Sequence, residues 1–457
     1  MQKSEYEVMG TMHKLMRYIK GYEKQAVLAP LFKMLEATFE LFVPLVVASI
    51  IDTGIKNGDT VFIWQRCGLL VLLAAIGLTC SLTAQYFSAK AALGFGTALR
   101  KDLFRHIDTL SYSELDGIGT PTLVTRMTSD INQVQNGVNL TLRLLLRSPF
   151  IVIGALIMAY TISPRLTLLF VAATVVISLI IYLIMRATVP IYHDAQNGLD
   201  KVTLLTRENY VGARVVRAFS RQADELAAFV ETNDHLRNIQ TMAGLISALM
   251  NPLTYLVINL AIIALLLRGS HEVNNGALTQ GEIIALINYM NQILVSLLRL
   301  ADLVISVTRA LASGMRVNEI LNTHTTMPDP QAKELAADPA APAVDFADVT
   351  FTYRGAGAPS LTDVSFTAKA GETIGVIGGT GSGKSTLIDL VCRFYDATAG
   401  TVSLFGHNVK EYGFAQLRHM VGIVPQQAVL FTGTIRDNMC WAAPDATDEE
   451  IWQALEI

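Results

Sequence analysis

The chain has 457 residues, of which 51% are hydrophobic and only 16% are charged, and its mean hydropathy is +0.41. Such a composition excludes an ordinary soluble protein. A net charge of −4 without a basic stripe excludes a nucleic-acid-binding surface. The 4 cysteines show no metal-ligand or disulfide spacing, so we expect reduced thiols.

The N-terminal segment, residues 1–22, is amphipathic and basic, with Lys3, Lys14, Arg17 and Lys20. This pattern is typical of a helix that lies on the inner surface of a membrane. No cleavable signal peptide is apparent in it.

Apolar runs of membrane-spanning length follow. Residues 166–185 and 242–267 contain no charged side chain, and each run is longer than a helix needs to cross a hydrocarbon core of about 30 Å. We predict six spans, at about 25–51, 61–84, 141–163, 165–186, 242–268 and 280–306.

The first predicted span is the least apolar, because Lys33, Glu36 and Glu40 share one helical face. Charged residues inside a membrane usually face a cavity or a partner. One hypothesis is that Glu36 and Glu40 line a transport pathway and favour cationic amphiphiles. The alternatives are that Lys33 pairs with Glu36, or that this face lies at the membrane interface.

The loops between spans two and three and between spans four and five are long and rich in Lys and Arg. Basic loops stay in the cytoplasm, so six spans would place both chain termini on the cytoplasmic side. Residues 100–110 and 204–219 have apolar side chains at helical spacing. The spanning helices are therefore expected to extend well beyond the bilayer.

Residues 323–343 are rich in proline and alanine and read as a linker. The pattern then changes to alternation with period two, which predicts strands at 344–353, 365–369 and 400–405.

A glycine-rich segment after the linker matches the pattern G-x-x-x-x-G-K-[ST]. A predicted strand at 373–378 precedes it and a predicted helix at 386–394 follows, which is the order that a phosphate-binding loop requires; a glycine-rich surface turn is the alternative. The expected phosphate-binding residues are Gly378, Gly379, Thr380, Gly381, Ser382, Gly383, Lys384, Ser385 and Thr386.

Each residue type in this loop has a physical reason. Glycines let the backbone N–H groups approach phosphates, and the helix N-terminus adds its positive end. Lys384 is expected to contact the β- and γ-phosphates, and Ser385 to offer its hydroxyl to Mg²⁺. The expected cofactors are therefore ATP and Mg²⁺.

With these features the chain resembles an ATP-binding-cassette (ABC) exporter half-transporter. The resemblance implies an α-helical six-span transmembrane domain of the type IV exporter kind in residues 1–322. A truncated α/β P-loop nucleotide-binding domain would follow in residues 344–457. The similarity is greatest to one member of bacterial heterodimeric multidrug exporters, which implies the cytoplasmic (inner) membrane of a bacterium.

The resemblance also implies roles for two residues outside the loop. Tyr353, in the Phe-Thr-Tyr sequence 351–353, would stack on adenine, although a half-buried strand tyrosine is the alternative. Gln426, in the segment 421–431, would be the glutamine that contacts Mg²⁺ and water. Gln427 stands where many members carry an acidic residue.

Two further segments are similar to the intracellular loops of this family. Short coupling helices are expected near 111–120 and 210–217, and they would dock on nucleotide-binding domains.

Three expected motifs were not found in residues 344–457: the signature sequence, the aspartate strand with its catalytic glutamate (Walker B) and the switch histidine. The acidic cluster 448–450 reads as the solvated start of a helix. We therefore expect a C-terminally truncated chain that binds ATP without hydrolysing it, with no catalytic residue besides the contact from Gln426.

The function implied by the resemblance is ATP-driven export of amphiphilic small molecules, multidrug or lipid-like, by alternating access. The expected partners are a second half-transporter, membrane lipid and a small-molecule substrate, but no nucleic acid. A heterodimer is favoured and a homodimer is possible. The alternatives are an ATP-binding, catalytically degenerate regulatory half, a peptide or lipid exporter, and a channel-like structural protein.

Overall fold

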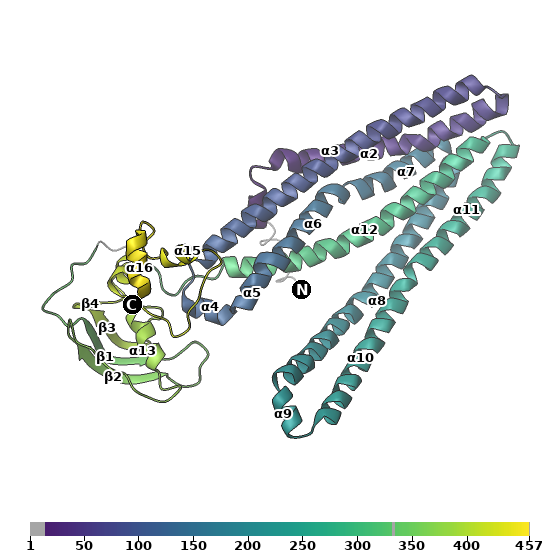
Figure 1. Cartoon of the computed structure of the whole chain (residues 1–457). Coiled ribbons are helices and arrows are strands. Elements are labelled where there is room, and N and C mark those ends of the chain that lie inside the picture. Colours follow the sequence, from purple (N-terminus) through teal and green to yellow (C-terminus); the bar gives the residue numbers. More distant parts are fainter. Residues whose placement is uncertain (1–13, 331–333, 457) are drawn as a thin grey trace. The chain divides into compact units, whose positions relative to one another are not determined.

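The computed structural model describes residues 14–330 and 334–456, and the chain divides into two compact units. The helical unit comprises Met1–Asp108 and Pro121–Asn322, and the sheet unit comprises Thr109–Thr120 and Thr323–Ile457. Figure 1 shows the elements of each unit. A short segment near residue 115 thus belongs with residues that come more than 200 positions later.

The helical unit contains long helices, two short π-helical segments (η2, η3) and one 3₁₀ turn (η1). They are η1 Arg17–Ile19, α2 Glu23–Ser49, η2 Ile50–Ile55, α3 Thr60–Ile107, α5 Thr120–Thr125, η3 Arg126–Asp130, α6 Ile131–Leu144, α7 Arg147–Ile162, α8 Pro164–Val211, α9 Ala213–Ala218, α10 Gln222–Ala248, α11 Met250–Asn274 and α12 Gln280–Leu321.

Among the residues that the structure describes, five helical tracts are long and apolar enough to cross a membrane. They are Glu23–Ile55, Thr60–Ile107, Thr120–Ile162, Pro164–Val211 and Gln222–Asn274. Each of them overlaps one predicted span. The sixth predicted span, 280–306, lies in α12, a helix of 42 residues that is not one of the five. The sixth span and the orientation of the termini therefore stay predictions.

The helices extend beyond the length that a bilayer requires, as the loop patterns predict. Helices α3 and α8 each have 48 residues, whereas about 20 suffice to cross the hydrocarbon core. Helices α8 and α10 run side by side and are joined through α9 at the tip of a long hairpin (Figure 1).

The core of the helical unit forms around α12, which contacts α2, α6, α7, α8 and α11. Tyr289 of α12 is fully buried and donates its hydroxyl to the carbonyl of Leu41 at 2.6 Å, so its polar atom is satisfied. At the start of α12, the Asp52 carboxylate accepts the Gly281 N–H at 2.8 Å and the Thr279 hydroxyl at 2.6 Å. A negative charge is favourable at a helix N-terminus.

Gly281 permits a close approach between α12 and α2. A Cβ atom at this position would lie 2.4 Å from the Ala48 carbonyl oxygen, which belongs to the backbone and cannot move aside easily.

The N-terminal amphipathic helix is described only from residue 14 onward, and residues 1–13 lie outside the described part of the chain. Leu15 and Tyr18 are buried. The Tyr18 ring packs edge-on against Phe95 of α3 with centroids 6.2 Å apart. This part of the segment therefore packs on the helical unit.

The sheet unit contains α4 Tyr112–Ile118, β1 Val344–Phe351, β2 Leu361–Ala368, α13 Lys384–Val391, β3 Ala399–Leu404, β4 His407–Asn408, α14 Phe414–Met420, α15 Ile435–Met439 and α16 Asp448–Glu456. The strands form an antiparallel sheet in the order β2-β1-β3-β4. Val344 is paired with Ala368 on one side and with Leu404 on the other. The three strands predicted from alternation correspond to β1, β2 and β3.

The core of the sheet unit lies on one face of this sheet. Phe346 stacks on Phe366 with ring centroids 4.7 Å apart, and Val349, Val402 and Tyr412 are almost fully buried beside them.

The strand predicted at 373–378 is wrong, because these residues form no strand in the structure. Ile374 is 42% exposed and Ile377 is 98% exposed. An apolar β-branched run becomes a strand only where another strand supplies hydrogen-bond partners. Strand β1 is already flanked by β2 and β3, and no described strand pairs with this run.

Candidate functional site

The phosphate loop, residues 378–386, has the backbone geometry that its sequence predicts. Gly381 and Gly383 have φ values of +84° and +87°, which other residues rarely adopt. A Cβ atom at Gly383 would also lie 2.6 Å from the carbonyl oxygen of Ser360, and one at Gly378 would lie 2.5 Å from the Ser382 hydroxyl. Glycine is therefore required at Gly383 for both conformation and space.

Helix α13 (Lys384–Val391) begins within this segment and leaves its first-turn N–H groups free of side-chain capping. Its N-cap is Gly383, and no side chain forms a capping hydrogen bond there. Such uncapped N–H groups, with the positive end of the helix dipole, form a site suited to phosphate. The residues present therefore fit the phosphates of a nucleotide.

The ammonium group of Lys384 lies across the loop. Its Nζ donates to the carbonyl oxygens of Gly378 at 2.9 Å and Gly379 at 2.6 Å. The neighbouring Ser385 is exposed. The positive charge is thus held within reach of a phosphate group bound by the loop.

Tyr353 lies next to the phosphate loop. Its hydroxyl lies 3.1 Å from the Thr386 hydroxyl. Its ring packs edge-on against Phe351 and Tyr395, with centroids 4.8 and 5.2 Å away. Tyr353 is thus half-buried in an aromatic cluster beside the loop, and its stacking on adenine stays a prediction.

Gln426 is not brought to the loop by any hydrogen bond among the described residues. It is exposed and lies in a segment without regular secondary structure, in which Val424 is 95% exposed and Leu430 is 82% exposed. The described residues also contain no group of three or more His, Cys, Asp or Glu side chains that could hold a metal ion. The Mg²⁺ contacts of Ser385 and Gln426 stay predictions.

Helix α4, at the first predicted coupling position, packs on residues that follow the phosphate-loop helix. The ring of Tyr112 lies 4.8 Å from that of Phe394, and the Tyr395 hydroxyl donates to the Asp116 carboxylate at 2.5 Å. The sequence reasoning missed Phe394 and Tyr395. The aromatic pair directly after an amphipathic helix was the signal that could have revealed them.

A second contact of α4 is made by Glu114, whose side chain is buried at 2% exposure. Its carboxylate completes a capping box with Ser111 and accepts the Thr326 hydroxyl at 2.8 Å. Burial raises the pKa of Glu114, but the hydrogen bonds from Ser111 and Thr326 outweigh this and hold the pKa below its usual value. Helix α4 is therefore fixed both to the linker and to the end of α13.

Two titratable groups at α13, Asp389 and Cys392, have raised pKa values. Burial, and then the nearby charge of Asp116, raise the pKa of Asp389 in α13. Burial and the charge of Asp389 raise the pKa of the Cys392 thiol. Cys392 is therefore a packed thiol rather than a reactive one.

At the second predicted coupling position, the tip of the α8–α10 hairpin exposes apolar side chains. Tyr210 is 86% exposed, Val211 77% and Phe219 75%. Exposed apolar residues gathered in this way mark an interaction surface.

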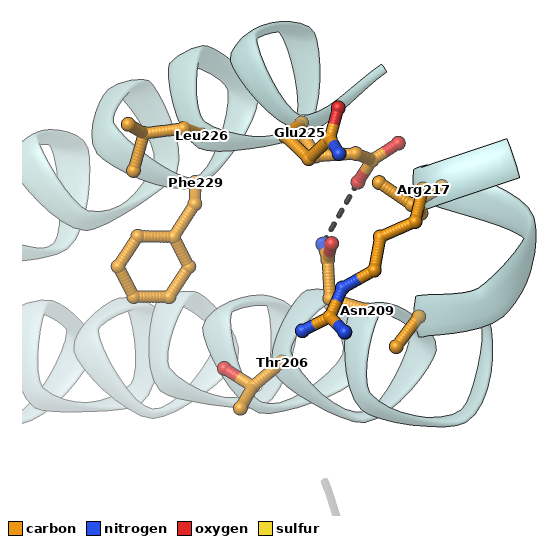
Figure 2. Close-up of a pocket in the computed structure, with 9 residues that line it drawn as sticks. Thr206, Asn209, Arg217, Glu225, Leu226 and Phe229 are labelled. Carbon is orange, nitrogen blue, oxygen red and sulfur yellow. Dashed lines mark hydrogen bonds between the residues drawn. The ribbon is translucent and has the colours of Figure 1, made fainter. Parts of the chain in front are cut away.

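A cavity of about 340 Å³ lies beside this tip, between α8 and α10. Figure 2 shows Thr206, Asn209, Arg217, Glu225, Leu226 and Phe229 around it. Asn209 donates its side-chain amide to the Glu225 carboxylate at 2.8 Å, which ties the two arms of the hairpin together.

In the helical unit, Lys33, Glu36 and Glu40 of α2 all form ion pairs. Lys33 donates to Glu36 at 2.5 Å and to the Ser81 hydroxyl at 3.0 Å. Arg147 of α7 donates to Glu40 at 2.6 Å. The alternative that Lys33 pairs with Glu36 is confirmed, and Arg147 is a partner that the sequence reasoning missed.

Two family descriptions match the chain. The ABC transporter transmembrane region matches residues 27–297, and the ABC transporter family matches residues 361–457.

Three proteins with similar sequences serve as examples. An uncharacterised ABC transporter ATP-binding protein of Mycobacterium tuberculosis is 34% identical over 446 residues, which cover 97% of this chain and 77% of that protein. A multidrug efflux ATP-binding/permease protein of the same species is 29% identical over 96% of this chain and 37% of its own length. A fatty acid ABC transporter ATP-binding/permease protein of Mycobacterium bovis is 30% identical over 78% of this chain and 56% of its own length.

Proposed function

Because the chain belongs to the ABC transporter family, we propose that it is one half of an ATP-driven exporter of amphiphilic small molecules in the cytoplasmic membrane of a bacterium. One observation carries this proposal: a phosphate loop with the required glycine geometry lies on the same chain as five membrane-length helical tracts. A nucleotide cycle can then be coupled to movement within the membrane.

We propose that the phosphate loop holds the phosphates of ATP and that Lys384 neutralises their charge. Ser385 would contribute a ligand to Mg²⁺, and Gln426 a second contact to that ion. Tyr353 would contact adenine from the aromatic cluster beside the loop. Its hydrogen-bond distance to Thr386 supports this role, because it places the ring at the edge of the phosphate site.

The contact of α4 with Phe394 and Tyr395 supports coupling between nucleotide and membrane. Helix α4 is continuous in the chain with α3 and α5, and α13 carries the phosphate loop at its start. Nucleotide binding that moves α13 would therefore pull on α3 and on the helical tract Thr120–Ile162, which begins with α5. Alternating access requires two states with different affinity for ATP. The connection through α4 would transmit the difference between these states from the nucleotide site to the membrane helices.

We propose that a second half-transporter completes the site, as a heterodimer in preference to a homodimer. The exposed apolar side chains at the α8–α10 tip support a protein partner there. The termini of both halves would lie in the cytoplasm.

We also propose that the 457 residues alone bind ATP without hydrolysing it. Phosphoryl transfer to water needs a group that orients the water. None of the described hydrogen bonds of the phosphate loop involves a carboxylate.

The names of the relatives support an amphiphilic substrate, because one is a multidrug efflux protein and another a fatty acid transporter. A fatty acid combines an apolar chain with a polar group.

The test is the ATPase rate of the full-length protein in lipid, alone and together with a candidate partner half. Turnover that appears only with the partner would support the heterodimer. Turnover by the protein alone would support a homodimer, and absence of turnover in both cases would contradict an ATP-driven exporter. A partner that is active by itself and is accelerated by this chain would instead support a regulatory, degenerate half.

A further inference from the structure

A second cavity, of about 330 Å³, lies in the helical unit between α2, α7 and α12. Its polar side includes Glu40, Arg147, Asn288, Gln292, Ser296 and Arg299. Its apolar side includes Val43, Val47 and Ile151. The cavity is therefore amphipathic, with charged groups and aliphatic groups facing the same space.

The Glu40 carboxylate lines this cavity, and both it and the neighbouring Glu36 carboxylate of α2 are already bound by cations. Glu36 is bound to Lys33 at 2.5 Å, and Glu40 to Arg147 at 2.6 Å. Arg147 also lies 3.9 Å from Glu36, so these four side chains form one network of zero net charge. Each carboxylate therefore already has a cationic partner within the fold.

The positive charge of Arg299, which also lines the cavity, lies outside this network and is not neutralised by it. Arg299 is exposed, and it forms no ion pair within the part of the chain that the structure describes. An arginine inside a membrane-spanning segment is costly unless a counter-charge or water meets it. The cavity therefore carries a net positive charge at Arg299.

The amide side chains of α12 lie on the same side of the helix as this arginine. Asn288, Gln292 and Arg299 are spaced at i, i+4 and i+11, which places them on one helical face. Gln292 and Arg299 are separated by roughly 10 Å along the axis, at about 1.5 Å per residue. A ligand can thus contact the arginine and the amides together.

The network also has unused hydrogen-bonding capacity. Arg147 is 6% exposed, and its Nε has no hydrogen-bond partner; the Gln292 Oε1 likewise has none. Buried polar atoms without partners are unfavourable. An acceptor atom of an occupant would satisfy the Arg147 Nε–H, whereas the Gln292 Oε1 would require a donor.

We propose that this cavity recognises the anionic group of an amphiphile, a carboxylate or a phosphate or sulfate ester, which binds Arg299 while the apolar chain packs on Val43, Val47 and Ile151. The proposal rests on the proposed export function and names its substrate class. It reverses the hypothesis from the sequence that Glu36 and Glu40 select cations, because both carboxylates are neutralised within the fold.

The experiment measures binding to the full-length protein in nanodiscs of phosphatidylcholine, which carries no net charge. The probes are 11-(dansylamino)undecanoic acid and its methyl ester, which differ in the negative charge. We expect the acid to bind about tenfold more tightly than the ester, the order of effect for a charge-assisted hydrogen bond. Equal affinities for the two probes would overturn the proposal.

The variant Arg299→Gln should lower the affinity for the acid about tenfold and leave the affinity for the ester unchanged. Unchanged ester binding also shows that the variant is folded. The matched control is Arg309→Gln, which changes another exposed arginine of α12 that does not line the cavity. If Arg299→Gln and Arg309→Gln had the same effect on the acid, the assignment to Arg299 would be wrong.

The variant Glu40→Gln separates this proposal from cation selection. It frees Arg147, so binding of the acid should become several-fold tighter, whereas a cation-selecting cavity would instead lose affinity for ethidium. Weaker ethidium binding with unchanged acid binding would overturn the proposal.

Two further arms identify the source of the anion and separate the two proposals. Inorganic phosphate should not displace the acid, whereas dodecanoate should; displacement by phosphate alone would contradict an amphiphile site. Binding of the acid without any ATP turnover would contradict the export function and leave the cavity assignment standing. ATP turnover without binding of the acid would contradict the cavity assignment and leave the export function standing.

Discussion

The phosphate loop and the cavity at Arg299 both present positive charge, yet they are built in opposite ways. The loop is nine consecutive residues, and its glycine conformations and helix start follow from their order in the chain. The cavity is assembled from three helices, and its lining residues from different helices are at least 100 positions apart in the sequence. A site made by local geometry can be read from sequence, whereas the charge of a site made by packing depends on which side chains neutralise one another.

We expect the largest effect from a substitution that removes the positive charge of the phosphate loop. Lys384→Ala should weaken ATP binding about a hundredfold, because a lysine that meets phosphate oxygens makes charge-assisted contacts. Fluorescent ATP binding would measure this. Lys369→Ala, an exposed lysine of the same unit, is the control; an equal loss in both variants would show that the loop is not the nucleotide site.

The next effect tests how strongly the helical unit depends on close packing. Gly281→Ala places a Cβ atom 2.4 Å from the Ala48 carbonyl oxygen, and we expect it to lower stability by about 1–3 kcal/mol. Thermal unfolding in detergent would show a lower midpoint. Gly68→Ala on α3, where no atom lies within 4 Å of the added Cβ, should leave the midpoint unchanged or raise it.

A smaller effect asks whether the nucleotide site extends beyond its consecutive residues. Tyr353→Ala should weaken ATP binding about tenfold if the ring contacts adenine. Tyr353→Phe keeps the ring and loses only the contact with Thr386, so it should bind ATP nearly as the original protein does. Equal losses in the two variants would assign the effect to the hydroxyl rather than to stacking.

The smallest effect concerns α4. The pKa of Glu114 is lowered in the folded protein, so its stabilising contribution is present above the ordinary value of 4.5 and is lost as the pH falls through the lower folded value. Hydrogen exchange of residues 112–118 should therefore become faster at acidic pH, beyond the change in intrinsic rate.

In Glu114→Gln this acid-induced change should be nearly absent, with α4 already less protected at neutral pH by about 1 kcal/mol. Glu449→Gln, an exposed glutamate of α16, should behave like the original protein. A Glu114→Gln variant that retained the full acid dependence would show that another group holds α4.

The sequence predicted what local patterns determine. Five of the predicted spans overlap membrane-length helical tracts, and β1, β2, β3 and α13 overlap the segments that alternation and the glycine motif predicted. The strand at 373–378 failed because a strand needs a partner, which periodicity cannot supply.

The candidate site divides in the same way. The conformation of the phosphate loop could be predicted, since Gly383 and Lys384 act through their immediate neighbours. The contact of Tyr112 with Phe394, and the neutralisation of Glu40 by Arg147, could not be predicted. Both join residues more than 100 positions apart, and their charges and rings become neighbours only when the chain is folded.

The membership of α4 in the sheet unit also has a consequence for synthesis of the protein. Its aromatic partners, Phe394 and Tyr395, are translated roughly 275 residues after Ile118, which takes on the order of 15–55 s at about 5–20 residues per second. During that interval α3 and α5 are already made while Tyr112 has no ring to pack against. In the nascent chain, α4 therefore lacks its aromatic contacts. Because Phe394 and Tyr395 are translated late, the packing of α4 against them is one of the last steps of folding.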